Sequence, residues 1–377
     1  MASPTIAIIT RSSLQRLNPR GDAYITNVES VSSYSWIDVP SPTIAVPGSP
    51  PLWSPPQVSL PLRKDTGLFY IAENTVRLPT CPMEPLFRAL YTTKPSFDVR
   101  SIDVISNRHT IRKLLSFVDP GSGRDTGETF SLELELVRNT LLMCRNVTSG
   151  TKYIEPHDFQ GFGHEFEKVY TTSQIAGSTS HYRIISYRFC GLKFMICYET
   201  DGFVKASNEA IVANDGASSL LESLLSLSLS LFSAKKASRT ANSSVTKLTV
   251  LQQGTTIPLE STLEVKTRAA RKPLPFHDVA PQLWVSQTPK LVRAYHHSGL
   301  FLTPQVEDVE AELRAWEHDN QEKLRTLGAL IDEIIKVMKC CGGRGRLRFD
   351  VATDSIVISR VEEAGMLPED LYSKWDE

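Results

Sequence analysis

Residues 181–202, HYRIISYRFCGLKFMICYETDG, are the part of the sequence that most constrains the fold. They read as two strands, and the second is apolar on both of its faces until it reaches Glu199. A strand of this kind lies in the middle of a sheet that is covered on both sides. The chain is therefore expected to build a mixed α/β fold around a buried central strand.

The composition sets broad limits on the class of protein. The 377 residues are enough for one large core, and 41% hydrophobic with 22% charged residues is typical of a soluble globular protein. A net charge of −1 argues against general affinity for nucleic acids, so any basic surface must be local. The six cysteines show neither CxxC pairs nor zinc spacing, which indicates reduced thiols in an intracellular protein.

The chain shows no membrane span. Its longest apolar run, around residues 220–232, alternates Leu with Ser and falls short of the roughly 20 apolar residues that a spanning helix needs. The first 21 residues contain arginines and serines but no acid, as mitochondrial presequences do, but we favour the simpler interpretation of a disordered N-terminus. We predict a nuclear or cytoplasmic protein without a membrane partner, with a mitochondrial location as the alternative.

Proline divides the chain into an arm and a domain. Ten of the 23 prolines lie within the first 61 residues, so residues 1–60 are predicted to form a largely irregular N-terminal arm. Residues 61–377 are predicted to form a single domain. A Ser/Leu/Ala-rich insertion is expected at about 206–246, and a long amphipathic helix at about 304–341, ended by glycines.

Other elements follow from hydrophobic periodicity. Residues 62–78 alternate as in a hairpin, and residues 130–147 read as a strand pair with a break at Arg138-Asn139. Helices are expected at 84–93, 107–118 and within 157–174, and a hairpin at 346–361.

Acidic and basic side chains follow the buried strand in a recurring pattern. Glu199 and Asp201 alternate at the end of the strand, so they share one side. Within STLEVKTRAA (261–270), Glu264 and Lys266 share a face in the same way, while their neighbours point to the core. Glu167 on a predicted helix and Gln287, three residues after Trp284, complete the set of candidates.

An acid at the end of one central strand followed by Glu-x-Lys on the next is the arrangement of PD-(D/E)XK nucleases. Carboxylate oxygens suit Mg²⁺ or Mn²⁺, which lowers the pKa of a bound water, and a neighbouring lysine can position that water. Simpler interpretations stay open: a solvated edge pair for Glu264 and Lys266, a surface acid for Glu167, and a helix-cap amide for Gln287.

Five motifs in order extend this into a family resemblance. From about residue 62 to 301, the segments SIDVISNRHTIRKLL, GHEFEKVYT, YETDG, LEVKT and LWVSQTPKLVRAYHHSGLF resemble the decapping exoribonuclease (DXO-type) family, whose nuclear members partner a 5′–3′ exoribonuclease. The resemblance implies mixed sheets flanked by helices. It also implies hydrolysis at an RNA 5′ end, such as a cap, a triphosphate or an NAD-cap.

The resemblance also implies a role for each candidate. Glu167, Asp201, Glu264 and the Val265 carbonyl would bind one or two Mg²⁺ or Mn²⁺ ions, and Glu199 would act through a coordinated water. Lys266 and Gln287 would orient the nucleophile and the scissile phosphate, while Arg108 would hold a substrate phosphate. Where the family has tryptophan and glycine beside that arginine, this chain has Asn107 and His109, so its pocket is expected to differ.

Two basic clusters could guide a nucleic acid to these acids. One includes Arg268 and Arg293, and the other surrounds Arg108. The alternative for each basic residue is a solvated strand or helix surface. Two other functions also stay open: a DNA-directed PD-(D/E)XK nuclease, and a non-catalytic RNA-binding scaffold.

Overall fold

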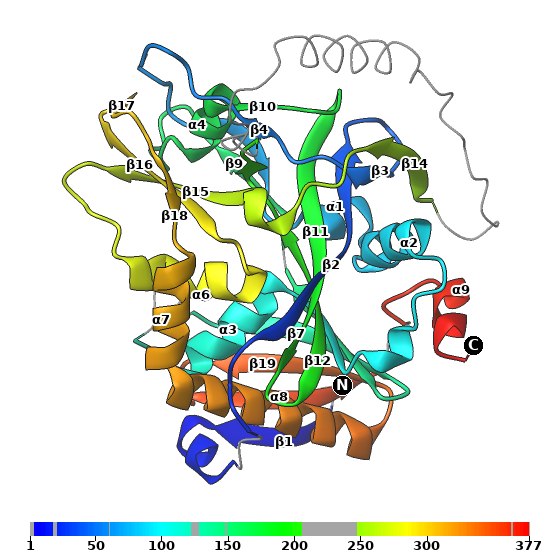
Figure 1. Cartoon of the computed structure of the whole chain (residues 1–377). Helices are drawn as coiled ribbons and strands as arrows, with labels where there is room; N and C mark the ends of the chain where they lie inside the picture. The colour runs from blue at the N-terminus through cyan, green and yellow to red at the C-terminus, as the bar shows by residue number, and fades with distance from the viewer. Residues whose placement is uncertain are drawn as a thin grey trace, which may run out of the picture.

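The computed structural model describes residues 4–17, 21–59, 61–121, 128–147, 149–205, 247–362 and 365–376. They form two large mixed sheets and one two-stranded sheet, with helices packed around them (Figure 1), as the predicted mixed α/β fold requires. The predicted insertion at 206–246 lies outside the described residues. Among the described residues, no helix is long and apolar enough to cross a membrane.

The larger sheet has eleven strands and contains the predicted central strand, β12. Its spatial order is β1 (Thr5–Thr10), β20 (Ser355–Val361), β19 (Arg344–Asp350), β7 (Phe130–Val137), β8 (Thr140–Asn146), β6 (Val104–Asn107), β12 (Leu192–Glu199), β11 (Ser178–Phe189), β2 (Thr26–Ile37), β3 (Thr43–Gly48) and β14 (Thr249–Gly254). β12 pairs in parallel with β6 and antiparallel with β11, so both of its edges are covered.

The smaller sheet has seven strands and lies beside the larger one in Figure 1. Its order is β10 (Thr171–Thr172), β4 (Leu52–Trp53), β13 (Gly202–Phe203), β15 (Thr262–Ala269), β16 (Lys290–His297) and β17 (Leu300–Phe301), with β18 (Val306–Asp308) also on β16. Since β12 ends at Glu199 and β13 begins at Gly202, the chain passes from one sheet to the other within residues 200–201.

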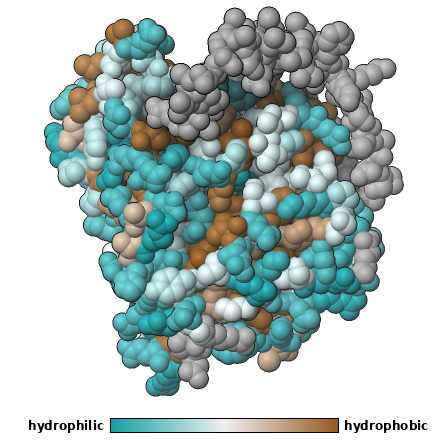
Figure 2. Space-filling view, viewed as in Figure 1, coloured by the Kyte–Doolittle hydropathy of each residue, from teal (hydrophilic) through white to brown (hydrophobic). Residues whose placement is uncertain are grey.

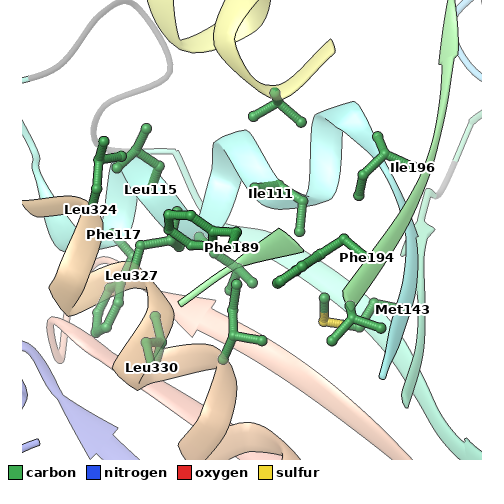
Figure 3. Close-up of a cluster of buried hydrophobic side chains, with 14 of the residues drawn as sticks. Ile111, Leu115, Phe117, Met143, Phe189, Phe194, Ile196, Leu324, Leu327 and Leu330 are labelled. Atoms are coloured by element: carbon green, nitrogen blue, oxygen red, sulfur yellow. The ribbon is translucent and has the colours of Figure 1, made fainter. Parts of the chain in front are cut away.

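Helices bury both faces of the larger sheet. One face packs against α3 (Arg108–Val118), α6 (Phe276–Ser286) and α8 (Gln321–Cys341), and Figure 3 shows Leu324, Leu327 and Leu330 of α8 beside Leu115 and Phe117 of α3. The other face packs against α2 (Glu84–Thr93) and α9 (Glu369–Tyr372). α4 (Gly163–Tyr170) covers the smaller sheet, and α1 (Glu73–Arg77) precedes α2 in the chain. Figure 2 shows the molecule from the same side as Figure 1. Hydrophobic residues gather near the middle of this face, with hydrophilic ones around them.

Several predicted elements are confirmed. α2 covers the residues predicted for it, and α3 begins after Asn107, whose side chain accepts a hydrogen bond from Thr110 N at 2.9 Å. β7 and β8 form the predicted pair, and Arg138 takes a positive φ of 55° in the turn between them. β19 and β20 form the predicted C-terminal hairpin.

The prediction of an irregular arm at residues 1–60 is wrong. β2 lies between β11 and β3 inside the larger sheet, and its Tyr34 and Trp36 are fully buried. The high proline content of this segment suggested irregular structure, but most of its prolines lie outside the strands. Pro40 and Pro42 flank the turn that follows β2, and β2 itself contains none.

Two smaller predictions also need correction. β5 (Gly67–Tyr70) pairs with the distant β9 (Thr151–Ile154) and not with a neighbour in a local hairpin. The long helix predicted at 304–341 is β18 followed by α7 (Glu310–Asp319) and α8, divided at Asn320. Asn320 donates its side-chain amide to the Trp316 carbonyl at the end of α7. The predicted glycine does end α8, where Gly342 has a φ of 60°.

Candidate active site

Glu264 lies at the centre of a buried polar cluster on β15. The residue is 2% exposed, and its side chain accepts hydrogen bonds from three donors on different elements. Arg108, at the start of α3, donates from Nη1 to Oε2 over 2.9 Å. Lys266 on the same strand and Gln282 on α6 both donate to Oε1. Because the Glu264 carboxylate is buried and also contacts Arg108 and Gln282, the interpretation of Glu264 and Lys266 as a solvated edge pair is wrong.

The charged neighbours of Glu264 decide its protonation state. Burial by itself raises the pKa of a carboxyl group, but the charges and hydrogen bonds of Lys266 and Arg108 outweigh it and lower the pKa to about 2. Glu264 is therefore ionised at neutral pH and keeps both cations in place.

Asp201 is attached to the same strand through the backbone. Its Oδ2 accepts a hydrogen bond from Val265 N at 2.7 Å, because β13 pairs with β15 directly after the chain changes sheets. Burial, and then the charge of Glu264, raises the pKa of Asp201 to about 8. Two neighbouring carboxyl groups thus differ strongly in proton affinity, which is common where groups are arranged for catalysis.

Glu199 and Glu167 complete the acidic cluster. Burial and the nearby Glu73 raise the pKa of Glu199 to about 7, although its side chain has accessible surface. Both observations hold because the accessible surface of Glu199 lines a pocket between other residues of the protein. Burial, then Asp201 and Glu199, raises the pKa of Glu167 on α4. The structure therefore brings together the four acids that the sequence singled out.

The donor set fits a hard divalent cation. Burial, and after it the charges of neighbouring carboxylates, raises the pKa values of three of the four acids, and a bound cation would favour their ionised forms. Within the described part of the chain, no three His, Cys, Asp or Glu side chains already surround one point suited to a metal ion. Here Glu264 is turned toward its three donors and Asp201 toward the backbone of β15.

Gln287 does not take the place predicted for it. It is the C-cap of α6, with a left-handed φ of 51°, and its amide donates to the Trp284 carbonyl at 2.6 Å. The helix-cap interpretation is confirmed. Gln282, earlier on the same helix, is the amide that reaches Glu264. The sequence signal for it was a lone polar residue between Asp278 and Ser286 on an otherwise apolar helix.

The remaining candidates lie near the cluster with their charges already balanced. Lys266, Arg268 and Arg293 share one face of the smaller sheet, because β15 and β16 pair Lys266 with Arg293. Arg293 donates from Nε to both carboxylate oxygens of Glu307, at 3.1 and 3.0 Å. Arg268 lies 3.9 Å from Asp278. The predicted role of the Val265 carbonyl stays a prediction.

Solved structures share this fold. The chain superposes on S. pombe Rai1 in complex with 3'-FADP with a TM-score of 0.58, 10% identity and coverage of 94% of this chain and 99% of that one. Candida albicans Rai1 in complex with pU5-Mn2+ superposes with a TM-score of 0.57 and 12% identity, over 95% of this chain and 97% of that one. Scheffersomyces stipitis Rai1 in complex with (3'-NADP)+ and calcium ion superposes with a TM-score of 0.57 and 11% identity, over 100% of this chain and 98% of that one. No curated protein sequence matches the chain.

The fold thus defines the class of the protein. It is the fold of the Rai1 and Dxo1 proteins, so the resemblance to the decapping exoribonuclease family is confirmed at the level of the fold. The sequence model of one protein family matches residues 7–372. The chain belongs to that family, which is described as Domain of unknown function (DUF8563).

Proposed function

We propose that this protein is a metal-dependent hydrolase that acts on the 5′ end of RNA. The observation that carries the proposal is the arrangement around Glu264, where one ionised carboxylate contacts a lysine, an arginine and an amide beside three carboxyl groups with raised pKa values. Proteins with the same fold have been solved in complex with pU5-Mn2+, 3'-FADP and (3'-NADP)+, which supports a nucleotide substrate.

Glu167, Asp201 and Glu264, with the Val265 carbonyl, would hold Mg²⁺ or Mn²⁺. When bound, such a cation lowers the pKa of a coordinated water and neutralises charge on a phosphate. Lys266 and Gln282, which share one oxygen of Glu264, would orient the attacking water. Arg108 would bind a non-bridging phosphate oxygen, since guanidinium groups match phosphate geometry.

The intact set of acids favours hydrolysis over a scaffold role. A protein that only bound RNA would gain nothing from the three carboxyl groups with raised pKa values, because their ionisation lowers the stability of the folded protein. The preference for RNA over DNA rests on the fold and not on the acids.

The experiment uses 5′-labelled RNAs that carry a triphosphate, an unmethylated cap, a methylated cap, an NAD-cap or a monophosphate, and one matched single-stranded DNA. Each is incubated with Mg²⁺, Mn²⁺ or EDTA. The double variant Asp201→Ala/Glu264→Ala is compared with Glu310→Ala, which removes an exposed acid of α7. Metal-dependent release of a 5′ product that only the double variant loses supports the proposal. No turnover of any substrate would overturn the hydrolase, and cleavage of DNA alone would overturn its RNA specificity.

A further inference from the structure

Three cavities meet at Arg145, the sixth residue of β8. The inner pocket, of about 190 Å³, reaches the candidate active site and is lined by Arg108 and Glu199 as well as Arg145. The outer groove, of about 510 Å³, and the side groove, of about 620 Å³, also contain Arg145 in their walls. One guanidinium group therefore stands where the active-site pocket opens into two larger grooves.

The inner pocket and the outer groove share more than this arginine. Ile71 and His109 also line both of them, so the two spaces adjoin along a common wall. The Arg145 Nη1 donates to the Ile71 carbonyl at 3.5 Å, which holds the side chain at this junction. Ile71 is itself 44% exposed, so the wall ends at the protein surface.

The outer groove is cationic. Of the described residues, Lys113, Arg145 and Arg348 line it with one carboxylate, Glu128, which pairs with Lys113 at 3.0 Å. α3 places Arg108 in the inner pocket and Lys113 in the outer groove, and each is paired with a carboxylate, Glu264 and Glu128. The net positive charge of the outer groove therefore comes from Arg145 and Arg348. Arg348 lies on the exposed side of β19.

A groove of this kind fits a single-stranded polyanion. Proteins that bind single strands combine a positively charged groove along the phosphates with contacts to the bases. A pocket for a terminal group alone would be closed at its far end, but here the inner pocket continues into open grooves. The volume of the outer groove is also in the range of ligand-binding clefts, about 300–1,000 Å³.

We propose that the inner pocket and outer groove form one channel for the RNA strand, in which Arg145 binds a backbone phosphate downstream of the scissile bond and Arg348 binds a later one. This inference rests on the proposed function and adds to it a path for the nucleotides that follow the cleaved end. The substrate is then recognised by its length as well as by its 5′ terminus.

The test measures binding without turnover. In an Asp201→Asn background, fluorescence anisotropy follows 5′-monophosphorylated oligoribonucleotides of one to eight nucleotides at several salt concentrations. Arg145→Ala and Arg348→Ala are compared with Arg145→Lys, which keeps the charge, and with Arg314→Ala, which removes an exposed arginine of α7. Melting temperatures confirm that each variant is folded.

We expect each alanine variant to weaken binding of the longer RNAs about tenfold. The slope of log affinity against log salt should also fall by about 0.7, since each variant removes one cation that neutralises a phosphate. Binding of the mononucleotide should be unchanged for Arg348→Ala, and Arg145→Lys should restore much of the affinity. Arg314→Ala should bind like the parent protein.

Three outcomes would overturn the channel. Equal losses for mononucleotide and octanucleotide with Arg348→Ala would show that the groove does not follow the strand. Arg346→Ala is measured alongside to probe the side groove, where Arg346 pairs with Glu133 at 2.7 Å. Weaker binding in this variant, with unchanged binding in Arg348→Ala, would assign the strand to the side groove. Unchanged affinity in Arg145→Ala and Arg348→Ala would exclude both the outer groove and the side groove as the path of the strand. Since none of these measurements needs hydrolysis, a failure of the proposed function remains distinguishable: the unmodified protein would then bind RNA through the channel and release no product.

Discussion

Arg108 and Glu264 join the two sheets of the protein through one ion pair. Arg108 begins the helix that follows β6 of the larger sheet, Glu264 belongs to β15 of the smaller sheet, and Nη1 lies 2.9 Å from Oε2. Both side chains are largely buried, with exposures of 13% and 3%. Removing one member of such a pair leaves the other charge buried and uncompensated, so this contact is a sensitive point for both folding and catalysis.

Arg108→Ala is expected to lower kcat by about 10²-fold, since preorganised charge near a reacting phosphate commonly contributes this much. The pKa values of Glu199, Asp201 and Glu264 should all rise in the variant, because the charge of Arg108 lowers each of them. The acidic limb of the pH–rate profile should then move to higher pH. A profile that keeps its shape while kcat falls would show that Arg108 contacts only the substrate.

Substitutions of Gln282 and Gln287 should differ clearly in their effect on activity. Gln282→Ala removes a donor to Glu264 and should reduce kcat by about 10-fold or more. Gln287→Gly should keep its activity and leave stability equal or higher by up to about 1 kcal/mol, because glycine adopts a left-handed φ without steric strain. Steady-state kinetics and thermal melting of both variants test this. Loss of activity in Gln287→Gly alone would restore the role first predicted for Gln287.

The metal-free protein should lose stability as the pH rises. The pKa of Asp201 is about 8 in the folded protein and about 3.9 in an unfolded chain, so the folded state holds this proton more tightly. The resulting stabilisation is complete below about pH 4 and is lost as the pH rises through 8, by an amount on the order of a few kcal/mol.

Melting temperatures in EDTA between pH 5 and 8 measure this loss against Asp201→Asn, which keeps an acceptor for Val265 N and cannot ionise. The unmodified protein should show the steeper decline, and Mn²⁺ should restore stability at pH 8 only when Asp201 is present. Parallel curves for the two proteins would contradict the raised pKa.

Trp36→Ala should destabilise the protein by about 3–5 kcal/mol, as large-to-small changes in cores do. Trp36 is 0% exposed on β2, and its Nε1 donates to Asn74 at 2.7 Å. Ile8→Ala, at a position 62% exposed on β1, is the control and should have little effect. Urea unfolding compares the two variants. Equal stabilities would mean that the N-terminal strands are dispensable, as an irregular arm would be.

The sequence predicted local elements best where hydrophobic periodicity was strong. β12 was recognised because it is apolar on both faces, and α3 because its helix pattern follows an Asn that caps it. β2 was missed because its partners, β11 and β3, are defined by pairing across the sheet and not by its serine-rich sequence. β5 was misassigned for the same reason, since its partner β9 begins more than 80 residues later. The exoribonuclease partner and the cellular location stay predictions.

The sequence by itself determined the chemistry of the site. Glu199 and Asp201 lie on one side of the chain, and so do Glu264 and Lys266, because side chains two residues apart on a strand point to the same face. Only the tertiary structure decided which distant groups complete it. Gln282, and not Gln287, reaches Glu264 because the direction of a helical side chain depends on how α6 packs, and a five-residue step along a helix turns a side chain to a different face. The junction at Arg145 likewise exists only because β5, β8 and α3 meet in space, and no local pattern in the sequence encodes that meeting.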